Sequence, residues 1–429
     1  WISMANRKKT IRKREGYLIV ALSWIVMSII GTMPYLFSGY IPHLVDALFE
    51  SISGFTTTGA SILSDIESMP YGILFWRSIS QWIGGMGIIV LTVALFPLLG
   101  IGGVELFVAE SSGTASDKLH PRIRETAKRL WLIYIGLTVL LTGLLILEGM
   151  TFFDAINHSF ATMSSGGFST KNASMAYFSD PIIQYTITFF MFTAGVNFTL
   201  IYFGLKWRLK KIWESDEFRA YVFVILLFVF FITIKVAYIA ELPLEKAFRD
   251  SLFQVVSIIT TTGFITADYT VWSPGLTMIF FIMMFLGASA GSTSGGIKLI
   301  RHLVFFKNSI LEFKRLIHPN AIVPLKLNGT TVSGRILIHI IIFLLLYMIL
   351  FVIGSILMSI MGYDFMTSVG LVATSLGNVG PGLGGVGPVD NFGWLGDGAK
   401  LLSAFLMLLG RLELFTILVL FTPYFWKST

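Results

Sequence analysis

Eight long apolar stretches constrain the fold of this chain more than any other feature of its sequence. They cover roughly residues 17–37, 71–100, 130–149, 181–205, 220–240, 275–303, 335–361 and 399–424. Because a helix of about 20 apolar residues crosses the hydrocarbon core of a bilayer, each stretch is long enough to span one. Only 13% of the residues are charged, against about 25% in soluble domains. The sequence therefore predicts an all-α polytopic membrane protein and excludes an ordinary soluble enzyme.

Basic residues gather in the N-terminal run and in the connections after the second, fourth and sixth stretches. They are Arg7, Lys8, Lys9, Arg12, Lys13 and Arg14, then Lys118, Arg122, Arg124, Lys128 and Arg129, then Lys206, Arg208, Lys210 and Lys211, then Arg301, Lys307, Lys314, Arg315 and Lys326. Lys and Arg concentrate in short cytoplasmic loops, so we expect both termini to be cytoplasmic. We interpret the net charge of +7 as a signal of orientation rather than of nucleic-acid binding.

The connections between odd and even stretches resemble one another. They read DALFESISGFTTTGAS from Asp46, DAINHSFATMSSGGFS from Asp154, DSLFQVVSIITTTGFI from Asp250 and DFMTSVGLVATSLGNV from Asp364. Each opens with Asp and reaches Gly thirteen positions later. A fourfold match at one offset predicts four repeated units, for which we expect the bounds 1–100, 101–211, 212–316 and 317–429.

Each repeated segment is predicted to enter the membrane as a half-helix and to return as an extended strand. Asp before an apolar helical run is typical of an N-cap, and ten helical residues cover only about 15 Å. Extended backbone at membrane depth is tolerated where it is buried in protein or lines water. Together with the eight spans, the four segments predict membrane-pore-membrane units around one pore.

The returning strands carry small hydroxylated residues and glycine but no carboxylate, so we expect main-chain carbonyls to replace the hydration shell of a monovalent cation. The candidate cation ligands are Thr56, Thr57, Thr58 and Gly59, then Ser164, Ser165, Gly166 and Gly167, then Thr260, Thr261, Thr262 and Gly263, then Thr374, Ser375, Leu376 and Gly377.

A run of small residues interrupts the sixth stretch and predicts an intramembrane loop that acts as a gate. Glycine disfavours a helix by about 1 kcal/mol relative to Ala, although a close helix contact through small residues is the alternative. The candidate gate residues in this run are Gly287, Ser289, Gly291, Ser292, Thr293, Gly295, Gly296 and Lys298. Lys298 either contacts the loop or marks its cytoplasmic exit. A Walker A motif is excluded because Ile297 separates Lys298 from the preceding glycine.

Three further basic or titratable side chains fall within the predicted membrane segments. Arg411 lies near the middle of the last stretch, where we expect it to face the pore below the filter; a structural ion pair with another helix is the alternative. For Arg77 we expect snorkelling to the interface, and for His158 a packing role.

Other function classes find little support in the residues. The sequence has no cysteine, no HExxH and no paired-carboxylate cluster, so we expect neither an enzyme nor a bound cofactor. A secondary transporter that couples a cation to an organic substrate is the second hypothesis. It would need inverted repeats and a roomy midplane site, whereas the repeats here are direct.

The chain resembles the superfamily of potassium transporters that includes the Trk, Ktr and plant HKT proteins. The four glycine segments carry this resemblance, together with GASAGSTSGGIK from Gly287 and GRLELFTILVLFTPYFW from Gly410. The last of these is most similar to the TrkH branch, the membrane subunit of bacterial Trk systems. The resemblance covers essentially the whole chain and implies potassium uptake across the bacterial inner membrane, with potassium as the transported ion.

The resemblance also implies further features. Glycine at the position of Gly59 accompanies potassium selectivity in the superfamily, and serine there accompanies sodium permeation. A homodimer embedded in membrane lipid is implied, with a TrkA-like ring of nucleotide-binding regulatory subunits on its cytoplasmic face and no nucleic acid. Proteins of the TrkH branch carry further helices before the first unit, so we expect such a pair to precede Trp1.

Overall fold

A computed structural model describes residues 13–94, 119–321 and 323–427 of the chain. Some of the predicted features lie outside these residues. They are the basic residues Arg7, Lys8, Lys9, Arg12 and Lys118, the side chains of Lys13, Arg122 and Arg124, and the expected unit boundary at residue 100. The described part is predominantly helical, with one short hairpin, and confirms the predicted all-α fold class.

The first helix of each unit is long and continuous. These helices are α1 (Lys13–Ser38), α6 (Leu119–Leu147), α11 (Asp216–Ile239) and α15 (Gly334–Ile360). Each is strongly apolar, yet most of its apolar residues are not buried inside the molecule. Since exposed apolar side chains of this density are disfavoured in water, these four helices are suited to a lipid environment.

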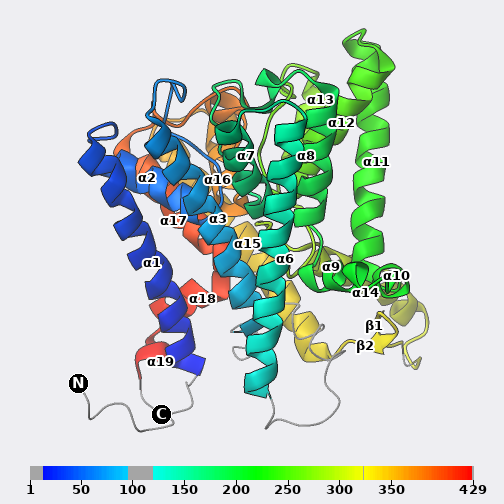
Figure 1. Ribbon diagram of the computed structural model, residues 1–429. Coiled ribbons are helices and arrows are strands. Elements are labelled where there is room, and N and C mark those ends of the chain that lie inside the picture. The colour runs from blue at the N-terminus through cyan, green and yellow to red at the C-terminus, as the bar shows by residue number, and fades with distance from the viewer. Residues whose placement is uncertain (1–12, 95–118, 322, 428–429) are drawn as a thin grey trace.

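A shorter helix follows in each unit: α2 (Leu44–Phe55), α7 (Phe152–Ser164), α12 (Leu244–Ile259) and α16 (Phe365–Gly377). With 12 to 16 residues, each covers roughly 18–24 Å, which is less than a bilayer. These are the four predicted half-helices, and Figure 1 shows them in the same half of the molecule.

Only one of the four expected Asp N-caps is present. Asp364 caps α16, where its carboxylate accepts a 3.0 Å hydrogen bond from the Thr367 amide; hydrogen bonds from Thr367 lower the pKa of this carboxyl. Asp46 and Asp154 instead occupy the first turns of α2 and α7, because the residues His43 and Thr151 stand at the N-caps. Asp250 lies inside α12, which begins at Leu244.

The second helices are continuous in the first unit and interrupted in the other three. The first is α3 (Tyr71–Ala94). In the second unit α8 (Pro181–Ala194) meets α9 (Phe198–Leu205) at 110°, and in the fourth α17 (Asp397–Arg411) meets the segment that begins with α18 (Leu414–Leu418) at 113°. In the third unit residues 284–298 separate α13 (Pro274–Met283) from α14 (Leu299–Ile317). The break in the third unit agrees with the interruption predicted there, whereas the expectation of a continuous second stretch is wrong for the second and fourth units.

Local sequence explains two of these breaks. Asn197 caps α9 by accepting a 2.8 Å hydrogen bond from the Thr199 amide, so a new helix begins at Phe198, shortly after Gly195 ends α8. Glu413, which precedes α18, has a left-handed backbone with φ +60°. A non-glycine residue rarely adopts this conformation, so α17 cannot continue through it.

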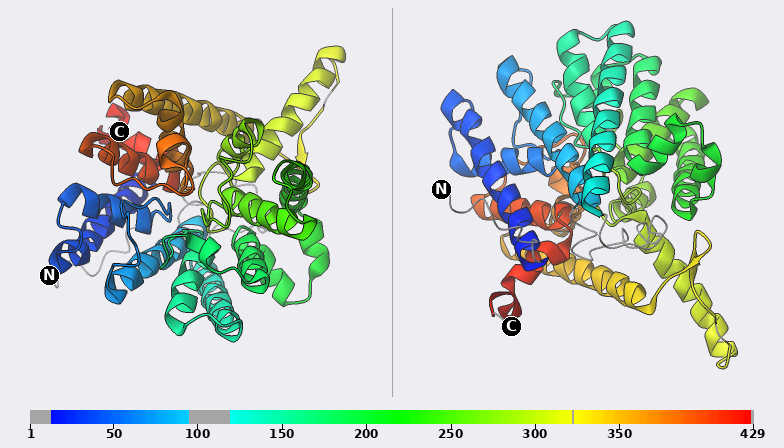
Figure 2. Two further views of the ribbon diagram at one scale, coloured as in Figure 1. Left: turned by 90° about the horizontal axis from the view of Figure 1, so that it is seen from above. Right: turned by 60° about the horizontal axis from the view of Figure 1, so that its bottom comes forward.

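Seen from above, the four units surround one centre, and the segments that follow the half-helices meet there (Figure 2). The beginning of α1 and helix α19 (Pro423–Trp426) lie at the same end of the molecule (Figure 1). The remaining elements are α10 (Leu209–Trp213), the 3-10 helices Ser174–Tyr177, Gly384–Val386 and Val419–Phe421, and an antiparallel hairpin of β1 (Lys326–Leu327) and β2 (Thr330–Thr331).

Candidate functional site: a ring of four glycine segments

The four half-helices end in the same way. In each, one residue turns into the left-handed region, and the next amide donates to the carbonyl five residues earlier, as in a Schellman motif. The left-handed residues are Thr57, Ser165, Thr261 and Asn378, with φ between +52° and +57°. The hydrogen bonds run from Thr58 to Ser53, Gly166 to Ala161, Thr262 to Ser257 and Val379 to Thr374, at 2.8–3.0 Å.

A glycine with positive φ follows two residues after each left-handed residue. These are Gly59 (φ +83°), Gly167 (φ +75°), Gly263 (φ +79°) and Gly380 (φ +101°). Each one lies against the carbonyl oxygen of the residue before the glycine of the next unit. A β-carbon built on Gly59 would lie 2.2 Å from the Gly166 oxygen, and one on Gly167 would lie 1.9 Å from the Thr262 oxygen. A β-carbon on Gly263 would lie 2.2 Å from the Val379 oxygen, and one on Gly380 would lie 2.8 Å from the Thr58 oxygen. The contacts close on themselves, so the four segments form one ring.

The structure corrects the predicted register of the fourth segment. Residues Thr374, Ser375, Leu376 and Gly377 all belong to helix α16, and Asn378, Val379 and Gly380 occupy the ring position instead. The N-cap residues His43, Thr151 and Asp364 each stand sixteen positions before a ring glycine. The sequence comparison matched Asp with Asp, although Asp364 is a cap, Asp46 and Asp154 lie in the first turns of their helices, and Asp250 lies further inside α12. Pro381, which directly follows Gly380, was the signal that could have located the end of the helix.

The extended backbone also begins later than expected in the first three units. Ser164 is the last residue of α7, and Thr56 and Thr260 still have helical backbone angles. The Thr56 hydroxyl donates to the Ile52 carbonyl and lies 2.8 Å from that of Thr58. The Thr260 and Thr262 hydroxyls are also 2.8 Å apart. These hydroxyls already form hydrogen bonds with each other and with carbonyls at the ends of the helices. The main-chain carbonyls of the segments are therefore the better candidate cation ligands.

A cavity of about 190 Å³ borders all four ring glycines. Its wall continues along the segments that follow the glycines and includes the charged residues Arg77, Lys171 and Asp390. Gly377 does not line this cavity, whereas Gly380 does. The ring therefore has an open vestibule on the side where the four segments leave it.

The predicted gate residues lie together in the non-helical segment 284–298, which contacts the ring at the ends of the half-helices. The Thr293 hydroxyl lies 2.9 Å from that of Ser165 and donates to the Met163 carbonyl at 3.0 Å. The Gly295 amide donates to the Thr261 hydroxyl at 2.6 Å. The alternative for this run was a close helix contact through small residues. The structure shows no continuous helix over residues 284–298.

The same segment is anchored to the break between α8 and α9. The Ser289 amide donates to the Gly195 carbonyl, and the Gly291 carbonyl accepts from Phe198, each at 3.1 Å. The other candidate gate residues bond within the segment: the Gly287 amide donates to Ile297, and the Ser292 hydroxyl donates to the Ser289 carbonyl. Gly291 and Gly296 have positive φ.

Arg411 lies at the end of α17 and reaches this segment. Its side chain is 3% exposed, and its Nη1 donates to the Thr293 carbonyl at 2.8 Å. Among the described residues, Nε and Nη2 of Arg411 have no hydrogen-bond partner. Glu413 pairs with Arg301 instead. Within the described residues the alternative of a structural ion pair for Arg411 is therefore wrong.

Lys298 contacts the same segment at Ser294, the residue after the one that Arg411 contacts. Its Nζ donates to the Ser294 carbonyl and lies 3.1 Å from the Ser294 hydroxyl. Lys298 therefore contacts the loop, as one of its two interpretations predicts. Two cationic side chains thus bind neighbouring carbonyls on the half-helix side of the ring.

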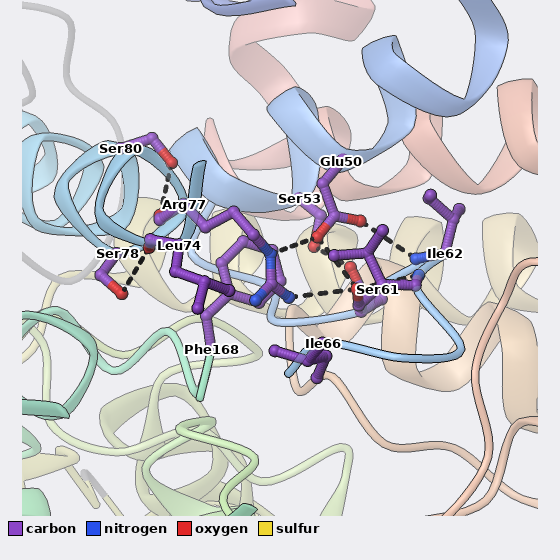
Figure 3. Close-up of polar contacts among 12 residues, drawn as sticks. Glu50, Ser53, Ser61, Ile62, Ile66, Leu74, Arg77, Ser78, Ser80 and Phe168 are labelled. Carbon is purple, nitrogen blue, oxygen red and sulfur yellow. Dashed lines mark hydrogen bonds and ion pairs between the residues drawn. The ribbon is translucent and has the colours of Figure 1, made fainter. Parts of the chain in front are cut away.

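The snorkelling interpretation of Arg77 is wrong. This side chain is 1% exposed and forms an ion pair with Glu50, as Figure 3 shows. Glu50 on α2 is fully buried, and nothing in the sequence pattern connects it with a residue on α3. His158 is buried as expected, with Nε2 2.9 Å from the Ser169 hydroxyl. Among the described residues no group of three or more His, Asp or Glu could hold a metal ion.

Comparisons with known proteins identify relatives along the whole chain. The model of the TrkH family, described as a cation transport protein, matches residues 1–428. The chain is 44% identical over 438 residues to "Trk system potassium uptake protein TrkH" of Salmonella typhimurium and of Escherichia coli, covering 100% of this chain and 89% of each relative.

A solved structure is also similar. The crystal structure of the potassium transporter TrkH from Vibrio parahaemolyticus matches with a TM-score of 0.89 and 39% identity. The match covers 99% of this chain and 87% of that one. The resemblance found in the sequence is confirmed.

Proposed function

The chain belongs to the TrkH family of cation transport proteins, and from this membership we propose that it takes up potassium across the cytoplasmic membrane. The observation that supports a selective pore in this chain is the closed ring of Gly59, Gly167, Gly263 and Gly380. Fourfold rings of backbone carbonyls replace the hydration shell of potassium in selective channels. In support of this, each of the four glycines lies against a main-chain carbonyl of the next unit, and all four border the vestibule.

The proposed cation ligands are the carbonyls around the ring. In the first three units they belong to residues predicted from the sequence, and in the fourth we propose Asn378, Val379 and Gly380 in place of Thr374 to Gly377. The C-terminal ends of the half-helices carry a partial negative charge and converge below the ring, which favours a cation there.

We further propose that segment 284–298 and Arg411 together gate the pore. The segment contacts the ring at Ser165 and Thr261, so it lies next to the path of any ion that leaves the filter. Arg411 carries a charge that no carboxylate among the described residues neutralises, and a cation in this place raises the barrier for potassium. Because Arg411 binds the Thr293 carbonyl, displacement of the segment would move the charge as well.

The partners and the orientation are part of the proposal. The relatives are named as proteins of a Trk system, which supports assembly with other subunits. We propose a homodimer that binds a cytoplasmic nucleotide-binding ring. The basic residues on α10 and α14 and at the hairpin support a cytoplasmic position for that end of the molecule.

Cation flux into liposomes tests this function. Purified protein should carry potassium and rubidium but little sodium or lithium. Gly59→Ser should admit sodium, because a β-carbon at Gly59 meets the Gly166 carbonyl at 2.2 Å and so displaces part of the ring. Absence of cation flux in a folded protein that also lacks residues 288–295 would refute the proposed pore.

A further inference from the structure

Glu50 and Arg77 form an ion pair beside the ring. The Nε of Arg77 lies 2.7 Å from Oε1 of Glu50, and both side chains are at most 1% exposed. They come from α2 and α3 of the first unit, and Figure 3 shows the guanidinium directed toward the Glu50 carboxylate and Ser61. Removing two charges from water is costly unless hydrogen bonds satisfy them fully. The remaining contacts of the pair therefore indicate what it holds in place.

The carboxylate binds the segment that leaves the ring at Gly59. Its Oε1 accepts a 2.9 Å hydrogen bond from the Ser61 hydroxyl, and its Oε2 accepts a 3.0 Å hydrogen bond from the Ile62 amide. Ser61 stands two residues after Gly59. Glu50 thus links the half-helix to the outgoing segment of its own unit.

The guanidinium extends this connection to the second unit. Nη2 of Arg77 lies 3.1 Å from the Ser61 hydroxyl, and Nη1 donates to the Ser169 carbonyl at 3.1 Å. The guanidinium carbon lies 4.1 Å from the centre of the Phe168 ring. Phe168 and Ser169 directly follow Gly167. The pair therefore joins the segments after two neighbouring ring glycines.

Within the described parts of the chain, the other units do not repeat this arrangement. The residues nine positions before the ring glycines are Glu50, His158, Gln254 and Leu371. His158 reaches the Ser169 hydroxyl at 2.9 Å, and Gln254 reaches the Thr266 hydroxyl at 3.4 Å. Leu371 has no polar group with which to do the same. One position on each of three half-helices thus binds the outgoing segment, and only the first uses a charged pair that also reaches the next unit.

We propose that Glu50 and Arg77 are positioning residues that fix the distance between the Gly59 and Gly167 segments and thereby set the discrimination between potassium and sodium. This inference rests on the proposed function. Neither side chain needs to touch the ion. Discrimination by a carbonyl ring depends on where its oxygens are held, and functional geometry of this kind depends on supporting residues to within about 0.5 Å.

The test compares Glu50→Gln, Arg77→Met and the double variant for the ratio of potassium to sodium flux in liposomes and for thermal unfolding. We expect the flux ratio to fall about tenfold in all three, which corresponds to about 1.4 kcal/mol, while potassium flux persists. Asp46→Asn with Lys400→Met is the matched control. That pair joins α2 to α17 at 2.6 Å, and Lys400 is 5% exposed. Its loss should change stability without changing the flux ratio.

The double variant separates positioning from a merely structural role. Replacing both members of a buried pair removes the unpaired charge that destabilises each single variant, so the double variant should regain stability. A recovered flux ratio in the double variant would overturn the proposal. If the single variants do not fold, Glu50→Asp serves as the test, because it keeps the charge and withdraws the carboxylate by one methylene. An unchanged flux ratio in Glu50→Asp would also overturn the proposal. Wild-type protein that carries no potassium would refute the proposed function instead.

Discussion

Gly380 and Gly377 offer a direct comparison of two registers for the fourth ring segment. The sequence repeat places Gly377 in the ring, whereas the structure places Gly380 there. We expect Gly380→Ala to impair ion selectivity severely and Gly377→Ala to leave it nearly intact. Both substitutions add a single methyl group within three residues of each other, so each one is the control for the other.

The magnitude follows from backbone conformation and contact. Gly380 has φ +101°, and non-glycine residues in sparsely populated backbone regions cost about 1–3 kcal/mol. Its added β-carbon would lie 2.8 Å from the Thr58 carbonyl oxygen, which is backbone and cannot rotate away. Strain of this size, taken up by the ring, changes the relative rates of two ions by about tenfold or more.

Gly377 lies in a helix and has no such strain. Ala there is favoured over Gly by about 1 kcal/mol of helix propensity, and the added β-carbon meets the Met284 carbonyl at 3.0 Å. A shift of a few tenths of an ångström relieves this contact. We therefore expect a small change in stability and no loss of selectivity.

Potassium and sodium fluxes are measured in liposomes for both variants, with the unfolding temperature as the check on folding. A low potassium to sodium ratio in Gly380→Ala with a normal ratio in Gly377→Ala supports the structural register. The reverse result would refute the assignment of Asn378, Val379 and Gly380 to the ring.

Three further outcomes are expected. Arg411→Ala should raise potassium flux severalfold, because it removes a charge below the ring that no carboxylate among the described residues neutralises. Arg301 is paired with Glu413, so Arg301→Ala should instead lower the unfolding temperature. An unchanged or lower flux in well-expressed Arg411→Ala contradicts the first expectation. Deletion of residues 288–295 should raise flux in liposomes and keep selectivity, and a folded deletion variant with wild-type flux would remove the gate from this segment. Asp364→Ala should destabilise the protein by about 1 kcal/mol through loss of the N-cap, measured as a lower denaturation midpoint, whereas Asp364→Asn should not, because Asn caps equally well.

Patterns within one segment could be predicted from the sequence. The half-helices follow from apolar runs too short to cross a bilayer, and the broken third unit follows from the glycines between residues 287 and 296. The structure contains both. Glu413 lies two residues from Arg411 and thus on another helical face, which indicated correctly that the two do not pair.

Features that depend on contacts between segments could not be predicted. The role of an Asp as cap or first-turn residue is decided by its neighbours, so matching Asp364 with Asp46 shifted the fourth segment by three residues. Arg77 near a helix start has the same sequence context whether it snorkels or is buried. Its position depends on Glu50, 27 residues away on another helix.

The buried arginines of this protein differ in what neutralises them, and this difference connects structure with mechanism. Arg77 binds Glu50, and Arg301 binds Glu413 while lying 3.8 Å from the centre of the Phe343 ring. In both pairs a carboxylate cancels the charge, so little field remains beyond the contact. Arg411 binds only the Thr293 carbonyl among the described residues. A positive charge that only a neutral carbonyl stabilises still repels a neighbouring cation. For this reason we propose that Arg411 forms the barrier and that Arg77 positions the ring.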